Sequence, residues 1–153
     1  MAAQLPDVLI QDGSKMDLYS NPLEPYWDLY PKKRPAFQIT KNCKRGYIAT
    51  WELCDSLLIL RGIEGNVKRS SFLFWKKIVP YSWRLLFPRV KSGGIVASWF
   101  TGKIRIPQGN SMIYVHNGYD SRFEREMIIT LDKGKVIKKV VLDNTQQKLL
   151  VEV

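Results

Sequence analysis

Residues 93–131, GGIVASWFTGKIRIPQGNSMIYVHNGYDSRFEREMIITL, decide the fold that this sequence predicts. They hold strong strand patterns, two turn signals and the single histidine of the chain. Gly109-Asn110 and Asn117-Gly118 both suit two-residue hairpin turns, because Gly and Asn tolerate the positive φ that such turns require. We therefore expect a turn at each dipeptide and a strand on either side of it.

The register of the first predicted hairpin assigns its residues to two faces. A tight turn at Gly109-Asn110 pairs residues 103–108 with residues 111–116, and paired residues share a face. The apolar face, which we expect to be buried, carries Ile104, Ile106, Ile113 and Val115. The polar face, which we expect to be exposed, carries Lys103, Arg105, Tyr114 and His116, and the second turn adds Tyr119.

Other strand and turn patterns flank this stretch. Residues 46–64 predict a hairpin with its turn at Asp55-Ser56, and residues 132–135 predict a further turn. The strand after it places Lys138 on one face with Val136, Val140 and Leu142, and residues 148–153 are typical of a last edge strand. We predict a mainly β fold: an antiparallel meander curled into a sandwich or a partly open barrel, with short helices in the first ninety residues.

The length of 153 residues predicts a single domain, 1–153, with enough chain to bury a core. Residues 1–45 carry five prolines and are expected to pack on this domain as an irregular segment. Within them, Asn21-Pro22-Leu23-Glu24 predicts a helix start, with Asn as the cap and Pro at the first helical position.

The charge of the chain favours acidic partners. Lys and Arg number 24 against 14 acidic residues, a formal net charge of +10, which attracts polyanions and acidic protein surfaces. A scattered basic surface that only aids solubility is the alternative. In residues 66–92, basic residues are interspersed with Trp75, Tyr81 and Trp83. This composition suits the binding of single-stranded nucleic acid. Packing in the core is the alternative explanation for the aromatic residues.

Compartment and cofactor signals are few. Cys43 and Cys54 form no metal-binding or redox motif, so we expect reduced thiols, no metal and no small-molecule cofactor. The first residues lack the basic start of a signal peptide, and no apolar run reaches about 18 residues. We therefore expect a cytoplasmic protein without a membrane partner.

The sequence marks no catalytic constellation. It has no GxSxG elbow, no P-loop and no dinucleotide fingerprint. A ribonuclease-like reaction is the alternative that survives: His116 as the acid, Glu52 or Glu124 as the base, and Lys103 with Arg105 stabilising the phosphorane. Because a lone surface histidine is more often non-catalytic, we assign no catalytic residues and expect a binding protein rather than an enzyme.

Three segments carry a resemblance: GYIATWE at residues 46–52, WFTGKIRI at residues 99–106 and YVHNGY at residues 114–119. With these, the chain resembles a family of small uncharacterised bacterial proteins over about residues 20–144. The resemblance implies a bacterial, cytoplasmic, single-domain protein and implies no activity.

The function that these patterns predict is binding of an acidic macromolecule, more readily a protein than a nucleic acid. Lys103, Arg105, Tyr114, His116 and Tyr119 form the predicted contact face, since Arg and Tyr concentrate binding energy at interfaces. An immunity-type neutraliser of a bacterial toxin is one concrete form. An RNA-binding or single-stranded-DNA-binding protein is the alternative.

Overall fold

The computed structural model describes residues 3–70, 76–81, 94–113, 122–143 and 148–152. These residues contain one α-helix, α1 (Glu24–Leu29), and one 3-10 turn (Pro31–Lys33). The strands are β1 (Asp7–Gln11), β2 (Ser14–Leu18), β3 (Tyr47–Cys54), β4 (Leu57–Ser70), β5 (Lys76–Pro80), β6 (Ile95–Val96), β7 (Gly102–Ile113), β8 (Arg122–Asp132), β9 (Lys135–Asp143) and β10 (Lys148–Glu152). The chain is thus mainly β, as predicted.

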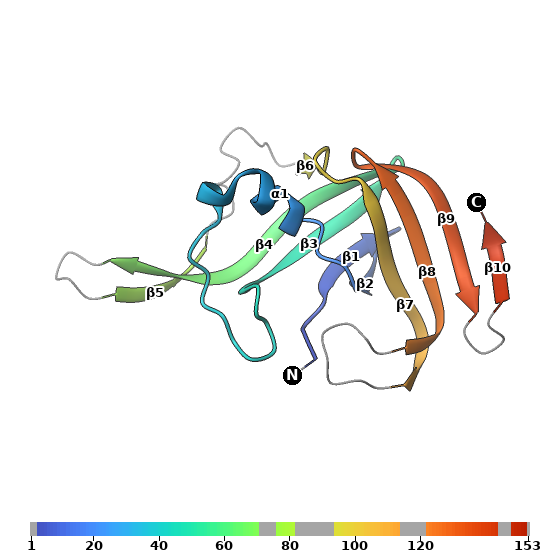
Figure 1. The fold of residues 1–153 in the computed structure, drawn as a ribbon, viewed down its shortest axis with the longest axis horizontal. Helices are drawn as coiled ribbons and strands as arrows, with labels where there is room; N and C mark the ends of the chain where they lie inside the picture. Colours follow the sequence, from blue (N-terminus) through green and yellow to red (C-terminus); the bar gives the residue numbers. More distant parts are fainter. Residues whose placement is uncertain (1–2, 71–75, 82–93, 114–121, 144–147, 153) are drawn as a thin grey trace.

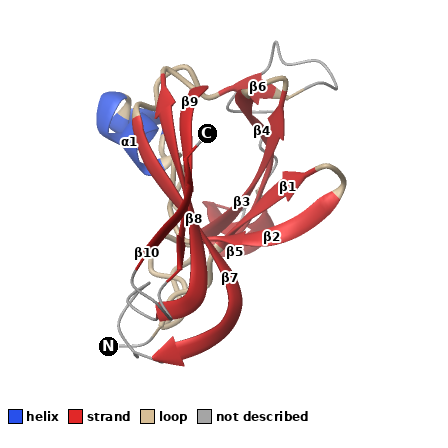
Figure 2. Cartoon of the chain, turned by 90° about the vertical axis from the view of Figure 1, so that its right-hand side faces the viewer, coloured by secondary structure: helices blue, strands red, loops and turns tan. Residues whose placement is uncertain are grey.

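The strands form one curved sheet with the order β2-β1-β3-β4-β9-β8-β7 (Figures 1 and 2). β10 pairs with β9, and β5 and β6 pair with β4. The sheet is mixed, because β1 runs parallel to β3, so the prediction of a purely antiparallel meander is wrong. Parallel strands need a long connection, and here it comprises β2 and residues 19–46 with α1.

The N-terminal segment was predicted to be irregular, but it contributes a hairpin to the sheet. β1 and β2 pair antiparallel around Asp12-Gly13, whose φ values of 51° and 79° suit a two-residue turn. Asp-Gly is a strong hairpin signal. The segment was nevertheless predicted to be irregular because of its five prolines. Leu9 and Leu18 from this hairpin are fully buried.

The predicted hairpin turn at Gly109-Asn110 is also wrong. β7 continues through both residues and pairs with β8 instead, with a register shift between Gln108 and Ser111. Gly within a strand is common at such an irregularity, because it accepts the local change in backbone geometry. The second predicted turn, Asn117-Gly118, lies outside the described residues.

The helical predictions need correction as well. α1 begins at Glu24 with Leu23 at the N-cap, so Asn21 is not the cap and Pro25 lies in the first turn. Asn21 instead accepts a backbone hydrogen bond from Glu24 N at 3.0 Å. The described part of the first ninety residues contains this single short α-helix rather than several.

The core lies on one face of the sheet and beneath α1. Trp27 of α1 packs against Tyr47 of β3 in a core that also contains Trp51. Ile104 and Ile106 of β7 and Ile129 and Leu131 of β8 belong to the same core. Burial of Ile104 and Ile106 and exposure of Lys103 confirm their predicted faces. The turns at Asp55-Ser56 and before Lys135, and an edge strand near the C-terminus, are also confirmed.

Candidate functional site

The five predicted contact residues divide into two groups. Lys103 and Arg105 lie on β7, where Lys103 is exposed and Arg105 is half-buried. Tyr114, His116 and Tyr119 lie outside the described residues, so their place on a shared face stays a prediction. Because β7 pairs with β8, the neighbours of Lys103 and Arg105 come from β8 and β9 rather than from residues 111–116.

The register of β7, β8 and β9 builds a face in three cross-strand rows. The rows are Lys103–Thr130–Lys138, Arg105–Ile128–Val140 and Pro107–Glu126–Leu142. Directly paired residues share a face of the sheet, so these nine residues lie opposite the core residues Ile104 and Ile129. Cations stand at one end of this face, and apolar residues occupy its middle.

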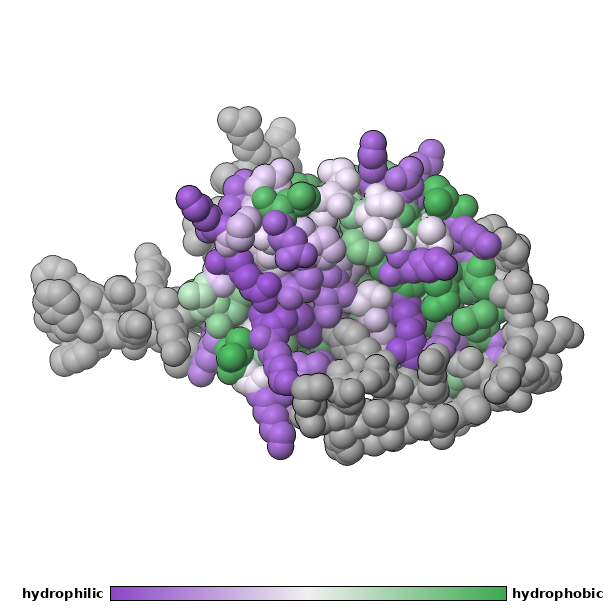
Figure 3. All heavy atoms as spheres, viewed as in Figure 1, coloured by the Kyte–Doolittle hydropathy of each residue, from purple (hydrophilic) through white to green (hydrophobic). Residues whose placement is uncertain are grey.

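A cavity of about 440 Å³ opens on this face. Its lining, which we call the β7–β9 groove, consists of Lys103, Ile128, Thr130, Lys138, Val140 and Leu142. The three apolar side chains are half-buried, whereas Lys103 and Lys138 are exposed. Figure 3 shows hydrophobic side chains gathered over β8 and β9 among hydrophilic ones.

Arg105 has an internal role next to the groove. Its guanidinium pairs with the carboxylate of Glu126, which is buried. The same guanidinium lies 5.2 Å from the ring centroid of Tyr19, and the backbone N–H of Tyr19 donates to Arg105 O at 2.8 Å. Arg105 therefore neutralises a buried acid and joins the end of β2 to β7. Lys103 and Lys138 are the exposed cations that line the groove.

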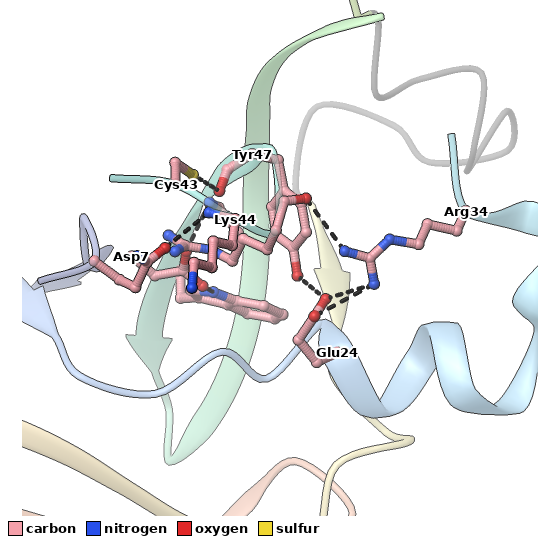
Figure 4. A network of polar contacts seen from close by, with 10 residues as sticks. Asp7, Glu24, Arg34, Cys43, Lys44 and Tyr47 are labelled. Carbon is pink, nitrogen blue, oxygen red and sulfur yellow. Dashed lines mark hydrogen bonds and ion pairs between the residues drawn. The ribbon is translucent and has the colours of Figure 1, made fainter. Parts of the chain in front are cut away.

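A second polar region surrounds Asp7, at the start of β1 (Figure 4). Its carboxylate accepts hydrogen bonds from Arg45 Nη2 at 2.8 Å, Ala49 N at 3.0 Å and Trp51 Nε1 at 3.1 Å. Burial raises the pKa of Asp7, and Arg45 acts in the opposite direction. Ala49 and Trp51 lie on β3 and Arg45 shortly precedes it, so this carboxylate holds β1 against β3.

Glu24 is the centre of the adjoining contacts in Figure 4. Tyr47 Oη donates to its carboxylate at 2.7 Å, and Arg34 Nη1 donates to it at 3.1 Å. Burial and the nearby Glu24 raise the pKa of the Tyr47 hydroxyl above its ordinary value. These residues border a polar cavity of about 350 Å³ lined by Gln4, Asn21, Glu24, Arg34, Lys44 and Arg45. Because Arg34 pairs with Glu24 and Arg45 with Asp7, this region primarily joins α1, β1 and β3.

The described residues do not test the ribonuclease-like alternative, because its acid, His116, lies outside them. Glu52 on β3 pairs with Arg61 on β4 at 2.7 Å. Glu124 lies on β8, and His116 lies outside the described residues. The described chain contains no group of three His, Cys, Asp or Glu residues that could hold a metal ion, and none of its helices is long and apolar enough to cross a membrane.

The predicted contact face contained Lys103 of β7 but not the other residues that line the groove. Ile128 and Thr130 of β8 and the groove residues of β9 were not assigned to the site. A signal was present, because period-two alternation placed Lys138, Val140 and Leu142 on one face. The predicted turn at Gly109-Asn110 paired residues 103–108 with residues 111–116, so the pairing of β7 with β8 was not predicted.

Comparison with known proteins adds no functional information: no family model, curated protein or solved structure matches this chain. The family resemblance of the three sequence segments therefore assigns no residue roles, and the site rests on its own geometry.

Proposed function

We propose that this chain is a non-catalytic protein that binds an acidic protein partner through the β7–β9 groove. One observation carries the proposal: on a single sheet face, an apolar floor lies beside a cross-strand row that carries two exposed lysines. Ile128, Val140 and Leu142 form the floor, and Lys103 and Lys138 stand at one end. None of the six described lining residues is acidic.

The two parts of the groove have separate roles in binding. Removing the half-buried floor from water on association is favourable by about 25 cal/mol for each Å² of apolar surface. Exposed lysines contribute less to affinity, but they accelerate encounter with an acidic surface and disfavour basic competitors. The partner that fits both is a short amphipathic segment with apolar side chains on one side and carboxylates near Lys103 and Lys138.

The predicted face extends this groove in the proposal. Tyr114, His116 and Tyr119 would add aromatic contacts with the partner to the contacts of the lysines. The main role of Arg105 would be to neutralise Glu126 rather than to bind the partner. An immunity-type neutraliser, which binds an acidic toxin surface, is one concrete form of this function.

We further propose that the curved sheet carrying the groove is a partly open barrel. Support comes from the Tyr19–Arg105 backbone hydrogen bond, which links the segment after β2 to β7. β2 and β7 are the two ends of the main strand order. Such an arrangement would hold β7, β8 and β9 rigidly, and a rigid face loses less conformational entropy on binding.

The proposal is tested by titrating the isotope-labelled chain with a synthetic peptide of alternating Leu and Glu, followed by amide chemical shifts. We expect shifts in β7, β8 and β9, and a several-fold weaker affinity for the variant Lys103→Gln/Lys138→Gln. The matched variant Lys32→Gln/Lys33→Gln removes the same charge from exposed positions elsewhere and should bind normally. A counterpart peptide with Lys in place of Glu should not bind.

Four outcomes would contradict this proposal. Equal losses of peptide affinity in the two double-lysine variants would show that net charge alone explains the effect. Shifts confined to other strands would move the site. Turnover of RNA that disappears in His116→Ala would transfer the chain to the enzyme class, and recovery of an oligonucleotide from the native complex would favour the nucleic-acid alternative.

A further inference from the structure

The polar cavity between α1 and the segment before β3 has a lining of mixed charge. It measures about 350 Å³, and its lining consists of Gln4, Asn21, Glu24, Arg34, Lys44 and Arg45. Three of these side chains are cationic, two are amides and one is a carboxylate. When the buried Asp7, which pairs with Arg45, is included, three cations stand against two acids, a net charge of +1. Cavities that bind small molecules begin at about 300 Å³, so this one is large enough for a small ligand.

The fold holds two of the cations in place before any ligand arrives. Arg34 Nη1 donates to Glu24 at 3.1 Å, and Arg34 Nη2 donates to Arg45 O at 3.2 Å, so its guanidinium is fixed at two points. Figure 4 shows the Arg34 side chain directed at Glu24. Arg45 Nη2 donates to Asp7 at 2.8 Å, and only 7% of the Arg45 side chain is exposed. A guanidinium that is already ordered loses less conformational entropy when it binds a ligand, and its planar fork matches a carboxylate.

The backbone that carries Lys44 is anchored as well. Gln4 uses both ends of its side-chain amide: Nε2 donates to Lys41 O at 3.1 Å, and Oε1 accepts from Lys44 N at 2.7 Å. Leu5 N donates to Asn42 O at 2.7 Å. The exposed Lys44 side chain therefore starts from a segment that two residues of the N-terminal strand region fix in position.

Glu24 gives the cavity a hydrogen-bond acceptor beside these cations. Its Oε2 accepts from Tyr47 Oη at 2.7 Å and from Arg34 at 3.1 Å, whereas Oε1 has a longer contact with Arg34 at 3.3 Å. A carboxylate offers about four lone-pair sites, so Oε1 can accept a further donor. The side chains of Arg34 and Glu24 are 34% and 37% exposed, so a ligand can reach both from solvent.

We propose that this cavity binds a small α-hydroxy or α-amino acid. The ligand's carboxylate would be bound by the cations of the lining, because hydrogen bonds between ionised groups are about twice as strong as neutral ones. Since Arg34 contacts Glu24, a carboxylate at Arg34 brings the neighbouring hydroxyl or ammonium group of the ligand to Glu24. A ligand with negative charge throughout would place like charges together at Glu24, which disfavours binding.

The test is titration of the isotope-labelled full-length chain with three acids of one carbon skeleton: glutarate, 2-hydroxyglutarate and glutamate. Glutarate supplies carboxylates alone, and the other two add a hydroxyl or an ammonium group at the neighbouring carbon. We expect saturable amide chemical shifts at the residues that line the cavity. At least one substituted acid should bind several-fold more tightly than glutarate, and the acid that does so identifies the donor.

Matched variants separate the cavity from overall charge. Lys44→Gln should weaken the binding on the order of 10-fold, the loss of one hydrogen bond to a charged group. Lys41→Gln removes the same charge from an exposed position of the same segment, outside the lining, and should bind normally. Glu24→Gln should reduce the preference for the substituted acid over glutarate. Where Glu24→Gln fails to fold, the comparison of the two exposed lysines still decides the test.

Specific results would overturn the proposal. They are no saturable binding of any of the three acids at millimolar concentration, shifts confined to residues away from the lining, equal affinity for all three acids, or equal losses in Lys44→Gln and Lys41→Gln. Equal affinity would show that the cavity attracts anions without selecting a donor. The groove variant Lys103→Gln/Lys138→Gln should bind these acids normally, so failure of this proposal is distinguishable from failure of the β7–β9 groove.

Discussion

At the scale of single residues, Asp7 shows how one buried carboxylate joins distant parts of the chain. It is the first residue of β1, and its three donors come from Arg45, Ala49 and Trp51, about forty positions later. Both Asp7 and Arg45 are buried. A buried charge is tolerated only when it is paired and hydrogen-bonded, so each member of this pair depends on the other.

Replacement of Asp7 by Ala should therefore lower the free energy of unfolding by about 3–5 kcal/mol, because it leaves the Arg45 guanidinium buried without its counter-ion. Urea denaturation followed by tryptophan fluorescence measures the change. Glu52→Ala is the matched control, since the Glu52–Arg61 pair is partly exposed and such pairs contribute about 0–1 kcal/mol. Similar losses in the two variants would contradict this account of Asp7.

At the scale of elements, α1 depends on the sheet. A helix of six residues is too short to be stable alone in water. Tyr26 and Trp27 bury their rings against the core, and Glu24 accepts the hydrogen bond from Tyr47 of β3. The helix is thus held by tertiary contacts at both its polar and its apolar side chains.

The Tyr47–Glu24 bond predicts a loss of stability at alkaline pH. The folded pKa of Tyr47 is raised, so its proton is held more tightly in the folded than in the unfolded chain. Its contribution is complete below the unfolded pKa of about 10 and declines as the pH rises above it, by up to about 1.4 kcal/mol per pH unit. Denaturation between pH 8 and pH 11 should show a smaller decline in Tyr47→Phe, and an identical decline would exclude Tyr47 as its source.

Turn chemistry explains which elements were predictable. Asp55-Ser56 and Lys133-Gly134 are short turns between neighbouring strands, and their hairpins were predicted from local sequence. Gly109-Asn110 has the same local signal but lies inside β7. A dipeptide that tolerates unusual φ suits a strand irregularity as well as a turn, and only the pairing with β8 selects between them.

At the scale of the whole molecule, residues 7–18 of the N-terminal segment are part of the sheet, whereas α1 of the same segment covers the core. β1 lies between β2 and β3 in the strand order, and Leu9 and Leu18 belong to the core. The segment after β2 reaches β7, where Ser20 Oγ accepts a hydrogen bond from Arg105 N at 3.1 Å. The two ends of the main strand order are joined through this segment.

Deletion of residues 1–18 should consequently abolish cooperative thermal unfolding, because it removes two strands and exposes the edge of β3. Circular dichroism over a temperature ramp measures this. Deletion of the residues after Asp143 removes β10, which pairs with β9 in the described sheet, and should preserve a cooperative transition. A cooperative transition in the N-terminal deletion would show that β1 and β2 are dispensable.

The sequence by itself determined the mainly β class, the local hairpins, the buried face of Ile104 and Ile106, and the positive charge. These properties depend on residue type and on alternation between near neighbours, which local sequence contains. The tertiary structure alone decided the parallel pairing of β1 with β3 and the cross-strand row that carries both Lys103 and Lys138. Each of these depends on pairing between strands, and the burial of one common core, rather than any local pattern, selects that pairing.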